Sequence, residues 1–341
     1  MIEKVLPGIF RIALPMPGSP LQSVNTYLLR GKERDLLIDS GINQKECKTA
    51  LIKALSELDV SMEQTDFFIT HLHEDHFGLA PILATDKSTI YLNFPETAFW
   101  ADPGRWNTGL DHGRKNGFPG EELNRFFKKT PGFLKRLPLD EMAKAVQFYQ
   151  ENIPAKGIRL QIIGDGERLN IGGYSLVCLF TPGHSSGHIC LYEPDKKFLF
   201  SGDHILETIT PAIFLWSGES WNPLHEYLKS LDKVLRLEID IVLPGHRGIF
   251  RDCRARVAEI KKHHSIREGE IASVLDANGK SAYEIASNVS WNIPLPWEQF
   301  SVELRWMALA ETLAHLKYME ERGKTTVKPQ DNGLELYYPP R

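Results

Sequence analysis

The chain has 341 residues, of which 42% are hydrophobic and 25% are charged, and 40 basic against 44 acidic side chains give a formal charge of −4. This composition is typical of a globular protein and excludes a disordered, collagen-like or coiled-coil chain. The length predicts about two domains, or one large domain with insertions. Four scattered cysteines are too few for a disulfide framework.

The sequence shows no membrane or secretion signal. It contains no apolar run of the roughly 20 residues that cross a bilayer, and Met1–Gly18 lacks a basic start followed by an apolar core. We therefore expect a cytoplasmic protein without a membrane partner. The near-neutral charge also speaks against a general nucleic-acid binder.

Two series of short strands are predicted along the chain, with helices between them. The first series is expected at Ile9–Leu14, Ser23–Leu29, Asp35–Ile38, Asp66–Thr70 and Ser88–Leu92, with a helix at Lys45–Leu58. The second is expected at Arg159–Ile163, Tyr174–Phe180, His188–Tyr192, Phe198–Ser201 and Asp240–Leu243, with helices at Leu224–Leu237 and after Gly248. This order predicts an α/β fold of two sheets packed face to face, with outer helices.

An aromatic insert interrupts this pattern at about residues 94–156. Its best predicted helices are Gly120–Lys129 and Asp140–Glu151. We expect the insert to be a lid whose aromatic side chains line an apolar substrate pocket. The alternative is that these side chains pack the insert's own helices or form a contact in a homodimer. Residues that would line such a pocket are Trp100, Trp106, Phe214 and Trp216. His112 lies in the insert, where we expect a surface loop.

The C-terminal region, 253–341, is predicted to be a small domain with three helices and a hairpin. A long helix covers Ala255–Leu275, and its His263 and His264 are expected to be solvated. Ser281 and Glu284 form a capping-box pattern that opens a second helix. A third helix with one apolar stripe ends at Gly323, and a hairpin follows. This is the element order of a winged helix, which leaves 1–252 as the main domain.

Metal-ligand residues are concentrated in the segment Thr70–His76. His71 and His73 are two residues apart at a strand end, so their imidazoles point to the same side. Asp75 and His76 follow at once. Three histidines and one aspartate within six positions indicate a metal site.

Three later turns supply further ligands, each after an apolar strand. His184 and His246 follow Pro-Gly turns, and Asp203 follows Ser-Gly. The five histidines and two aspartates suffice for two metals, each with three protein ligands, that share a water or hydroxide. Imidazole and carboxylate ligands suit zinc best and also allow manganese or iron(II).

The segments LLIDSG, HLHEDHFG, TPGHSSGH, SGDH and LPGH resemble the five ordered motifs of the metallo-β-lactamase-fold hydrolase superfamily, from about residue 7 to residue 250. This resemblance implies an αβ/βα sandwich with the site at one edge. It also implies that one metal is held by His71, His73 and His184, that the other is held by Asp75, His76 and His246, and that Asp203 bridges them. Asp39 would support the ligand loops from behind. The position of His188, four residues after His184, indicates separately that it donates to a ligand or lies near the substrate, with a purely structural role as the alternative.

Two bound cations would bring the pKa of a shared water toward neutrality, so a metal-bridging hydroxide would attack the substrate. Asp75 is expected to orient this hydroxide as the catalytic residue. The expected substrate is a small ester, thioester or lactone, because the SSGH continuation is similar to that of hydroxyacylglutathione hydrolases and related thioesterases.

Two other functions remain open. The overall arrangement also resembles β-lactamase-like proteins with a C-terminal winged-helix-like domain, and one branch of these is an endoribonuclease, so the chain could hydrolyse RNA or another phosphodiester. The 13 basic and 13 acidic residues from Arg251 to Arg341 speak against a nucleic-acid partner. A metal-bearing interaction or sensor protein is the further alternative.

Overall fold

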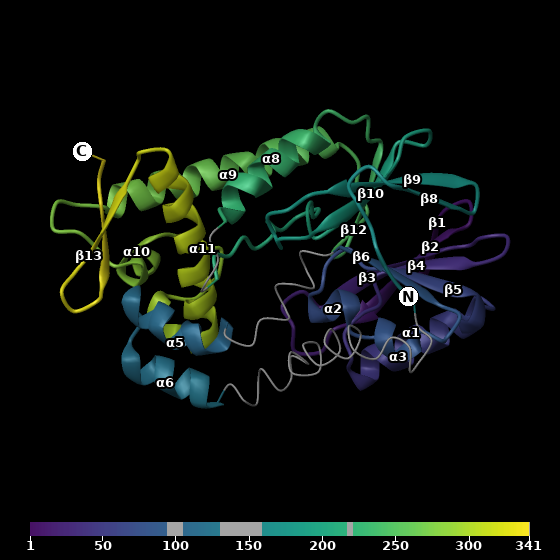
Figure 1. The fold of residues 1–341 in the computed structure, drawn as a ribbon, viewed down its shortest axis with the longest axis horizontal. Coiled ribbons are helices and arrows are strands. Elements are labelled where there is room, and N and C mark those ends of the chain that lie inside the picture. Colours follow the sequence, from purple (N-terminus) through teal and green to yellow (C-terminus); the bar gives the residue numbers. More distant parts are fainter. Residues whose placement is uncertain (94–104, 130–158, 217–220, 341) are drawn as a thin grey trace. The chain divides into compact units, whose positions relative to one another are not determined.

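The computed structural model describes residues 1–93, 105–129, 159–216 and 221–340 (Figure 1). The chain divides into two compact units. The first unit comprises Met1–Ala101, Pro138–Pro211 and Ser230–Val257, and the second comprises Asp102–Leu137, Ala212–Lys229 and Ala258–Arg341.

A seven-stranded sheet, in the order β1-β2-β3-β4-β5-β6-β7, forms one layer of the first unit. Strands β1 to β4 pair antiparallel, whereas β4 to β7 pair parallel. The strands are β1 (Ile2–Leu6), β2 (Ile9–Pro15), β3 (Ser23–Leu29), β4 (Asp35–Ile38), β5 (Thr65–Phe68), β6 (Thr89–Leu92) and β7 (Arg159–Ile162). The helical segments between them are α1 (Lys45–Glu57), η1 (Met62–Gln64), α2 (Glu74–Phe77) and α3 (Ala80–Leu83).

A five-stranded sheet, in the order β12-β11-β10-β9-β8, forms the second layer. It is antiparallel except for the parallel pair of β11 and β12. Its strands are β8 (Arg168–Ile171), β9 (Tyr174–Phe180), β10 (Ile189–Glu193), β11 (Phe198–Gly202) and β12 (Ile241–Pro244). Helix α8 (Pro223–Val234) precedes β12 and α9 (Cys253–Val274) follows it.

Alternation along the strands places apolar side chains on both faces of the first sheet. Leu37 packs in one buried cluster with Leu51 of α1. Its neighbours Leu36 and Ile38 belong to the other cluster, which also contains Phe200 of the second sheet. The two sheets therefore pack face to face with α1 on an outer side, which confirms the predicted α/β sandwich.

The second unit has a core of its own. It contains α5 (Arg105–Lys115), α6 (Gly120–Lys129), α10 (Ala282–Asn288), η2 (Trp297–Gln299), α11 (Val302–Glu321), β13 (Thr326–Pro329) and β14 (Glu335–Tyr338). Phe118 and Leu123 from the aromatic insert share buried contacts with Leu309 and Leu313 of α11. The described part of the insert thus joins the C-terminal helices in one core. The domain boundary at residue 252 and the winged-helix assignment stay predictions.

Some expectations about elements were incomplete or wrong. Strands β1 and β8 and helix α5 were not predicted, and the expected helix Asp140–Glu151 lies outside the described residues. His264 is only 3% exposed, so the expectation that it is solvated was wrong: its ring packs between those of Tyr227 and His315.

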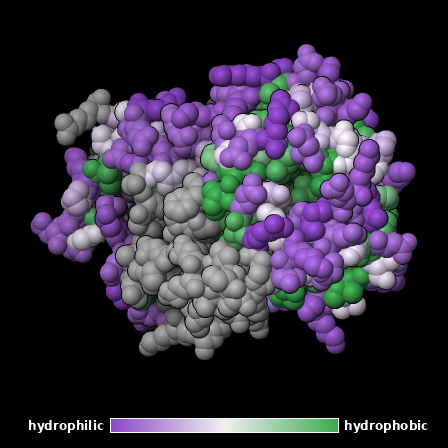
Figure 2. Space-filling model, turned by 45° about the vertical axis from the view of Figure 1, so that its right-hand side comes forward, coloured by the Kyte–Doolittle hydropathy of each residue, from purple (hydrophilic) through white to green (hydrophobic). Residues whose placement is uncertain are grey.

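Figure 2 shows a face on which hydrophilic side chains predominate between smaller hydrophobic patches. Among the helices that the structure describes, we find none with the length and apolar character that a bilayer crossing requires.

Candidate metal centre

The candidate ligands lie in four segments of the first unit, and each segment follows the carboxyl end of a strand. After β5, His71 and His73 lie in the loop and Asp75 and His76 lie in the short helix α2; His184 follows β9, Asp203 follows β11 and His246 follows β12. Strands hold these loops on a rigid scaffold, which is a common arrangement for functional residues.

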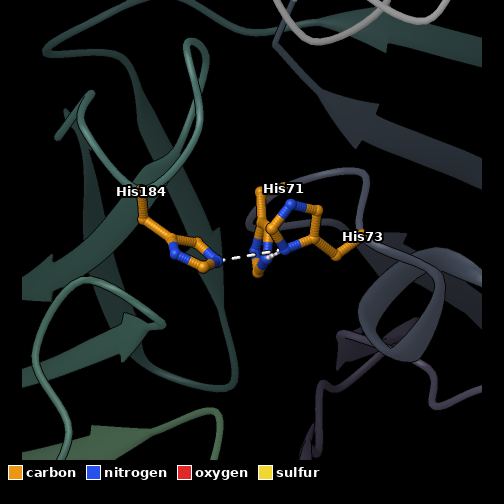
Figure 3. A group of neighbouring side chains, drawn as sticks. All are labelled: His71, His73 and His184. Carbon is orange, nitrogen blue, oxygen red and sulfur yellow. Dashed lines mark hydrogen bonds between the residues drawn. The ribbon is translucent and has the colours of Figure 1, made fainter. Parts of the chain in front are cut away.

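Three imidazoles converge in the first group of ligands (Figure 3). The Nδ1 atom of His73 lies 2.9 Å from Nε2 of His71 and 3.0 Å from Nε2 of His184. A neutral His73 cannot donate to both rings through one nitrogen. The three nitrogens meet as they would around one cation.

The second group joins one carboxylate to two imidazoles. Oδ2 of Asp75 lies 3.1 Å from Nε2 of His246 and 3.8 Å from Nε2 of His76. All three side chains come from loops that the sandwich brings together, although 170 residues separate His76 from His246 in sequence.

The carboxylate of Asp203 lies between the two groups. Its Oδ1 atom is 3.5 Å from Nε2 of His76. Its Oδ2 atom is 3.5 Å from Nε2 of His246 and 3.7 Å from Nε2 of His184. An oxygen of Asp203 also lies within 4.8 Å of ligand nitrogens of His71 and His76, so the carboxylate lies close to residues of both groups.

Hydrogen bonds from behind orient the rings. Asp39 accepts from the backbone N–H of Thr70 at 2.9 Å, and its Oδ2 atom lies 2.7 Å from Nδ1 of His76. The hydroxyl of Thr70 also bonds Asp39 and lies 3.1 Å from Nδ1 of His71. Nδ1 of His246 donates to the carbonyl oxygen of Ser23 at 2.7 Å. Because Nδ1 is engaged in each ring, Nε2 keeps its lone pair for the centre.

His188 supports Asp203 rather than joining the ligands. Its Nε2 atom accepts a hydrogen bond of 3.1 Å from the backbone N–H of Asp203. Its Nδ1 atom lies 2.9 Å from the hydroxyl of Thr181, to which it donates. Both ring nitrogens are therefore occupied, and the ring holds the backbone of the β11 loop in place.

Several buried atoms at the centre lack partners within the described protein. Nε2 of His76, Nε2 of His246 and Oδ1 of Asp203 have no hydrogen bond. Leaving such atoms unpaired is costly, and a cation would satisfy all three. The residues present, imidazoles and carboxylates without thiolate, fit a divalent metal such as zinc.

The electrostatics of the first group favour neutral imidazoles. Burial holds the pKa of His71 well below its usual range. Burial and the neighbouring His184 lower the pKa of His73 to about 3. In the second group, burial lowers the pKa of His76, but the carboxylates of Asp203, Asp39 and Asp75 outweigh it and raise the pKa well above its usual range. A cation bound by His76 and the neighbouring carboxylates would take the place of the proton on the imidazole of His76.

The geometry of the metal centre does not test the predicted substrate-pocket residues. Trp100 lies outside the described residues, and Trp106 belongs to α5. Phe214 and Trp216 lie in the second unit, where their ring centroids are 5.1 Å apart. Their role in a substrate pocket stays a prediction. His112 lies in α5, so the expectation of a surface loop was wrong.

The supporting roles of Thr70, Thr181 and Gly202 were not predicted from the sequence. A Cβ atom on Gly202 would lie 2.7 Å from Nε2 of His188 and 2.9 Å from the side chain of Thr70. Only glycine fits at this position. The available signal was that each residue directly precedes a ligand or a Pro-Gly-His turn.

Comparison with known proteins identifies the family. The family model described as metallo-beta-lactamase superfamily matches residues 20–246. The chain belongs to this superfamily. A metallo-beta-lactamase family protein from Thermus thermophilus has a similar structure, with a TM-score of 0.75 and 28% identity, over 98% of this chain and 100% of that one.

Two superfamily relatives are similar in sequence. The beta-lactamase-like protein 2 homolog of Caenorhabditis elegans is 28% identical over 80% of this chain and 73% of that protein. The human acyl-coenzyme A thioesterase MBLAC2 is 26% identical over 66% of this chain and 74% of that protein. Together with the superfamily match, these relatives identify the chain as a hydrolase.

Proposed function

We propose that this hydrolase holds two divalent cations and cleaves a small thioester. The observation that carries the proposal is the position of Asp203, whose carboxylate oxygens lie within 3.7 Å of ligand nitrogens from both groups. A carboxylate between two sets of ligands is the arrangement that a two-metal hydrolase needs.

Each group supplies three protein ligands besides Asp203. His71, His73 and His184 would hold one cation, and Asp75, His76 and His246 would hold the other. Zinc suits these residues best, with manganese or iron(II) as substitutes. Bound divalent cations lower the pKa of water toward neutrality and stabilise negative charge on a carbonyl oxygen.

The chain's own residues prepare the site for this chemistry. The outer contacts of Asp39, Thr70 and Ser23 fix the ring orientations. Little reorganisation is then needed at the moment of reaction. Asp75 extends its carboxylate beside His246, where it would hold the second cation and orient the attacking water.

The thioester is the favoured substrate class because the human relative is named as an acyl-coenzyme A thioesterase. Esters and lactones present the same type of carbonyl carbon and are the next candidates. A phosphodiester is less favoured, because the C-terminal region carries equal numbers of basic and acidic residues.

Metal analysis combined with a substrate panel tests the proposal. We expect about two zinc ions per chain and hydrolysis of a thioester in preference to a lactone and a phosphodiester. His73→Ala should lower the rate at least about 100-fold, because it removes the nitrogen that faces both His71 and His184. His225→Ala is the control, since its side chain is 47% exposed.

Three results would overturn the proposal: fewer than one bound metal per chain, cleavage of the phosphodiester alone, or unchanged activity in His73→Ala. The first would remove the metal chemistry and the second would replace the substrate class. The third would show that the histidine cluster does not carry the activity.

A further inference from the structure

A pocket in the second unit plays no part in the metal centre. It has a volume of about 300 Å³ and lies against α5, α11, the β13–β14 hairpin and residues 215–216. This volume is at the lower end of the range for small-molecule sites. Its apolar lining includes Leu215, Leu313 and Val327, and Trp216 adds an aromatic side chain.

Asn116, directly after α5, brings an unpaired acceptor to this pocket. Its side-chain Nδ2 donates to the carbonyl oxygen of His112 at 2.9 Å, which fixes the orientation of the amide. The Oδ1 atom is then the remaining acceptor, and it has no partner within the described residues. Asn116 is only 1% exposed, so this oxygen carries a cost that a suitable donor would remove.

His112 contributes a second unpaired atom on the same side of the pocket. It lies one helical turn before Asn116, lines the pocket, and its buried Nε2 atom has no hydrogen bond within the described residues. Burial, with the nearby charge of Lys115, lowers the pKa of His112 to about 4. The ring is therefore neutral at pH 7, and Nε2 can donate one hydrogen bond.

The charged residues that line the pocket balance in number, because Lys115 and Lys317 are matched by Glu320 and Glu335. Lys115 forms an ion pair of 2.6 Å with Glu335, and Lys317 forms one of 3.4 Å with Glu321, which lies outside the lining. Two positive and two negative side chains leave no net charge on the lining to attract an anion or a cation. The pocket therefore suits a neutral ligand.

We propose that this pocket binds a neutral small molecule through a secondary amide. The N–H of the amide donates to Oδ1 of Asn116, and its carbonyl oxygen accepts from Nε2 of His112. A secondary amide supplies both complementary atoms in one uncharged group, and its apolar substituents contact Leu313 and Val327. No activity of the metal centre is required for this binding.

A pair of matched fragments tests the proposal on the intact wild-type protein. The probe is N-propylacetamide, and the comparison is 2-hexanone, in which a methylene replaces the N–H. Binding is followed in the nuclear magnetic resonance spectrum through the Asn116 side-chain amide and the Trp216 indole N–H. We expect saturable shifts with the amide and about tenfold weaker binding of the ketone, because only the amide pairs with Oδ1.

Two asparagine variants assign the preference to one side chain. Asn116→Ala should bind the amide and the ketone equally. Asn288→Ala should keep the preference, because Asn288 makes the same type of bond, from Nδ2 to the carbonyl of Glu284 at 2.8 Å, but is exposed. Both variants lose one bond at a helix end, so they are matched for that loss.

The proposal is wrong if the wild type binds both fragments equally, if neither shifts these signals, or if Asn116→Ala retains the preference. The wild-type comparison needs no substitution, so it decides the question even where Asn116→Ala fails to fold.

Discussion

Each of three ligand histidines is held through Nδ1 by a different type of partner. His71 contacts a hydroxyl, His76 a carboxylate and His246 a backbone carbonyl. The three bonds have the same effect, since each presents Nε2 to the centre. The rings are thus oriented by the fold itself, and metal affinity should depend on residues that never touch a metal.

Gly202 offers a direct test of this dependence. Its φ is +48°, and a Cβ atom there would collide with His188 and Thr70. Gly202→Ala should therefore displace Asp203 and lower zinc affinity about 10- to 100-fold in competition with a chelator.

Gly173→Ala is the control: its φ is +85°, but its Cβ atom would meet nothing within 4 Å. The control should cost about 1 kcal/mol of stability and leave zinc affinity unchanged. Equal affinities in the two variants would contradict the argument.

His264 predicts a pH dependence of stability in the second unit. Burial lowers the pKa of its ring to about 3, against 6.5 for an unperturbed histidine, with His263 and Arg267 adding to the effect; His315 lies 3.3 Å away. As the pH falls below 6.5, the unfolded chain takes up a proton that the folded chain does not. The free energy of unfolding should therefore fall by about 1.4 kcal/mol per pH unit from this residue.

Denaturant unfolding between pH 6.5 and pH 4 checks this expectation. His264→Gln should show a flatter pH dependence than the wild type by up to that slope, whereas the exposed-residue control His225→Gln should follow the wild type. Parallel curves for His264→Gln and the wild type would refute the assignment.

Single residues differed in how well the sequence predicted them. The seven candidate ligands were predictable because their side chains carry the chemistry and the motifs place them at strand ends. The roles of Thr70 and Thr181 were not, since each depends on a partner in another loop or strand. His264 looked solvated because charged residues surround it in sequence, and only the packing of α9 against α11 buries it.

Helix α10 shows how a local pattern can fix an element. The hydroxyl of Ser281 accepts from the backbone N–H of Glu284, and the carboxylate of Glu284 accepts from the backbone N–H of Ser281. Both residues of this capping box lie within four positions of the sequence, so the start of the helix was predictable. Strands β1 and β8 had no such signal, because β1 shows little apolar alternation and β8 alternates over only four residues.

The cap of α10 should contribute more to stability than the cap of α11. Ser281→Ala removes two bonds of the hydroxyl, one accepted from the backbone N–H of Glu284 and one donated to its carboxylate, from a residue that is 3% exposed, and should cost about 1–2 kcal/mol. Ser301→Ala removes one bond of 3.2 Å to the N–H of Leu304 and should cost about 0.5–1 kcal/mol. Urea unfolding measures both values. A larger loss in Ser301→Ala would show that the second hydroxyl bond of Ser281, to the carboxylate of Glu284, adds nothing.

On the scale of the whole molecule, the sequence predicted the sandwich but not the composition of the second unit. Helices α5 and α6 lie more than 170 residues before α11, yet they share its core. The sequence pattern of each helix indicates only that the helix has an apolar face, and it does not indicate which other helix packs against that face. The two strand series were predictable because each alternates by itself.

The division into two units predicts a local response to metal removal. All seven candidate ligands lie in the first unit. A chelator should therefore raise amide hydrogen exchange in the loops after β5, β9, β11 and β12, because bound metal stabilises only the segments that hold it. Peptides from α10 and α11 serve as internal controls and should exchange as before. An equal rise in those helices would show that the second unit depends on the metal.

The spacing of the ligands also has a consequence for biosynthesis. His71, His73, Asp75 and His76 leave the ribosome together, whereas His246 follows His71 by 175 residues. A nascent chain therefore exposes a partial chelating cluster long before the β12 loop exists to complete it. At about 5–20 residues per second, this interval lasts roughly 10–35 s. The second group, which includes His246, is complete only when the last strand of the sandwich has been added.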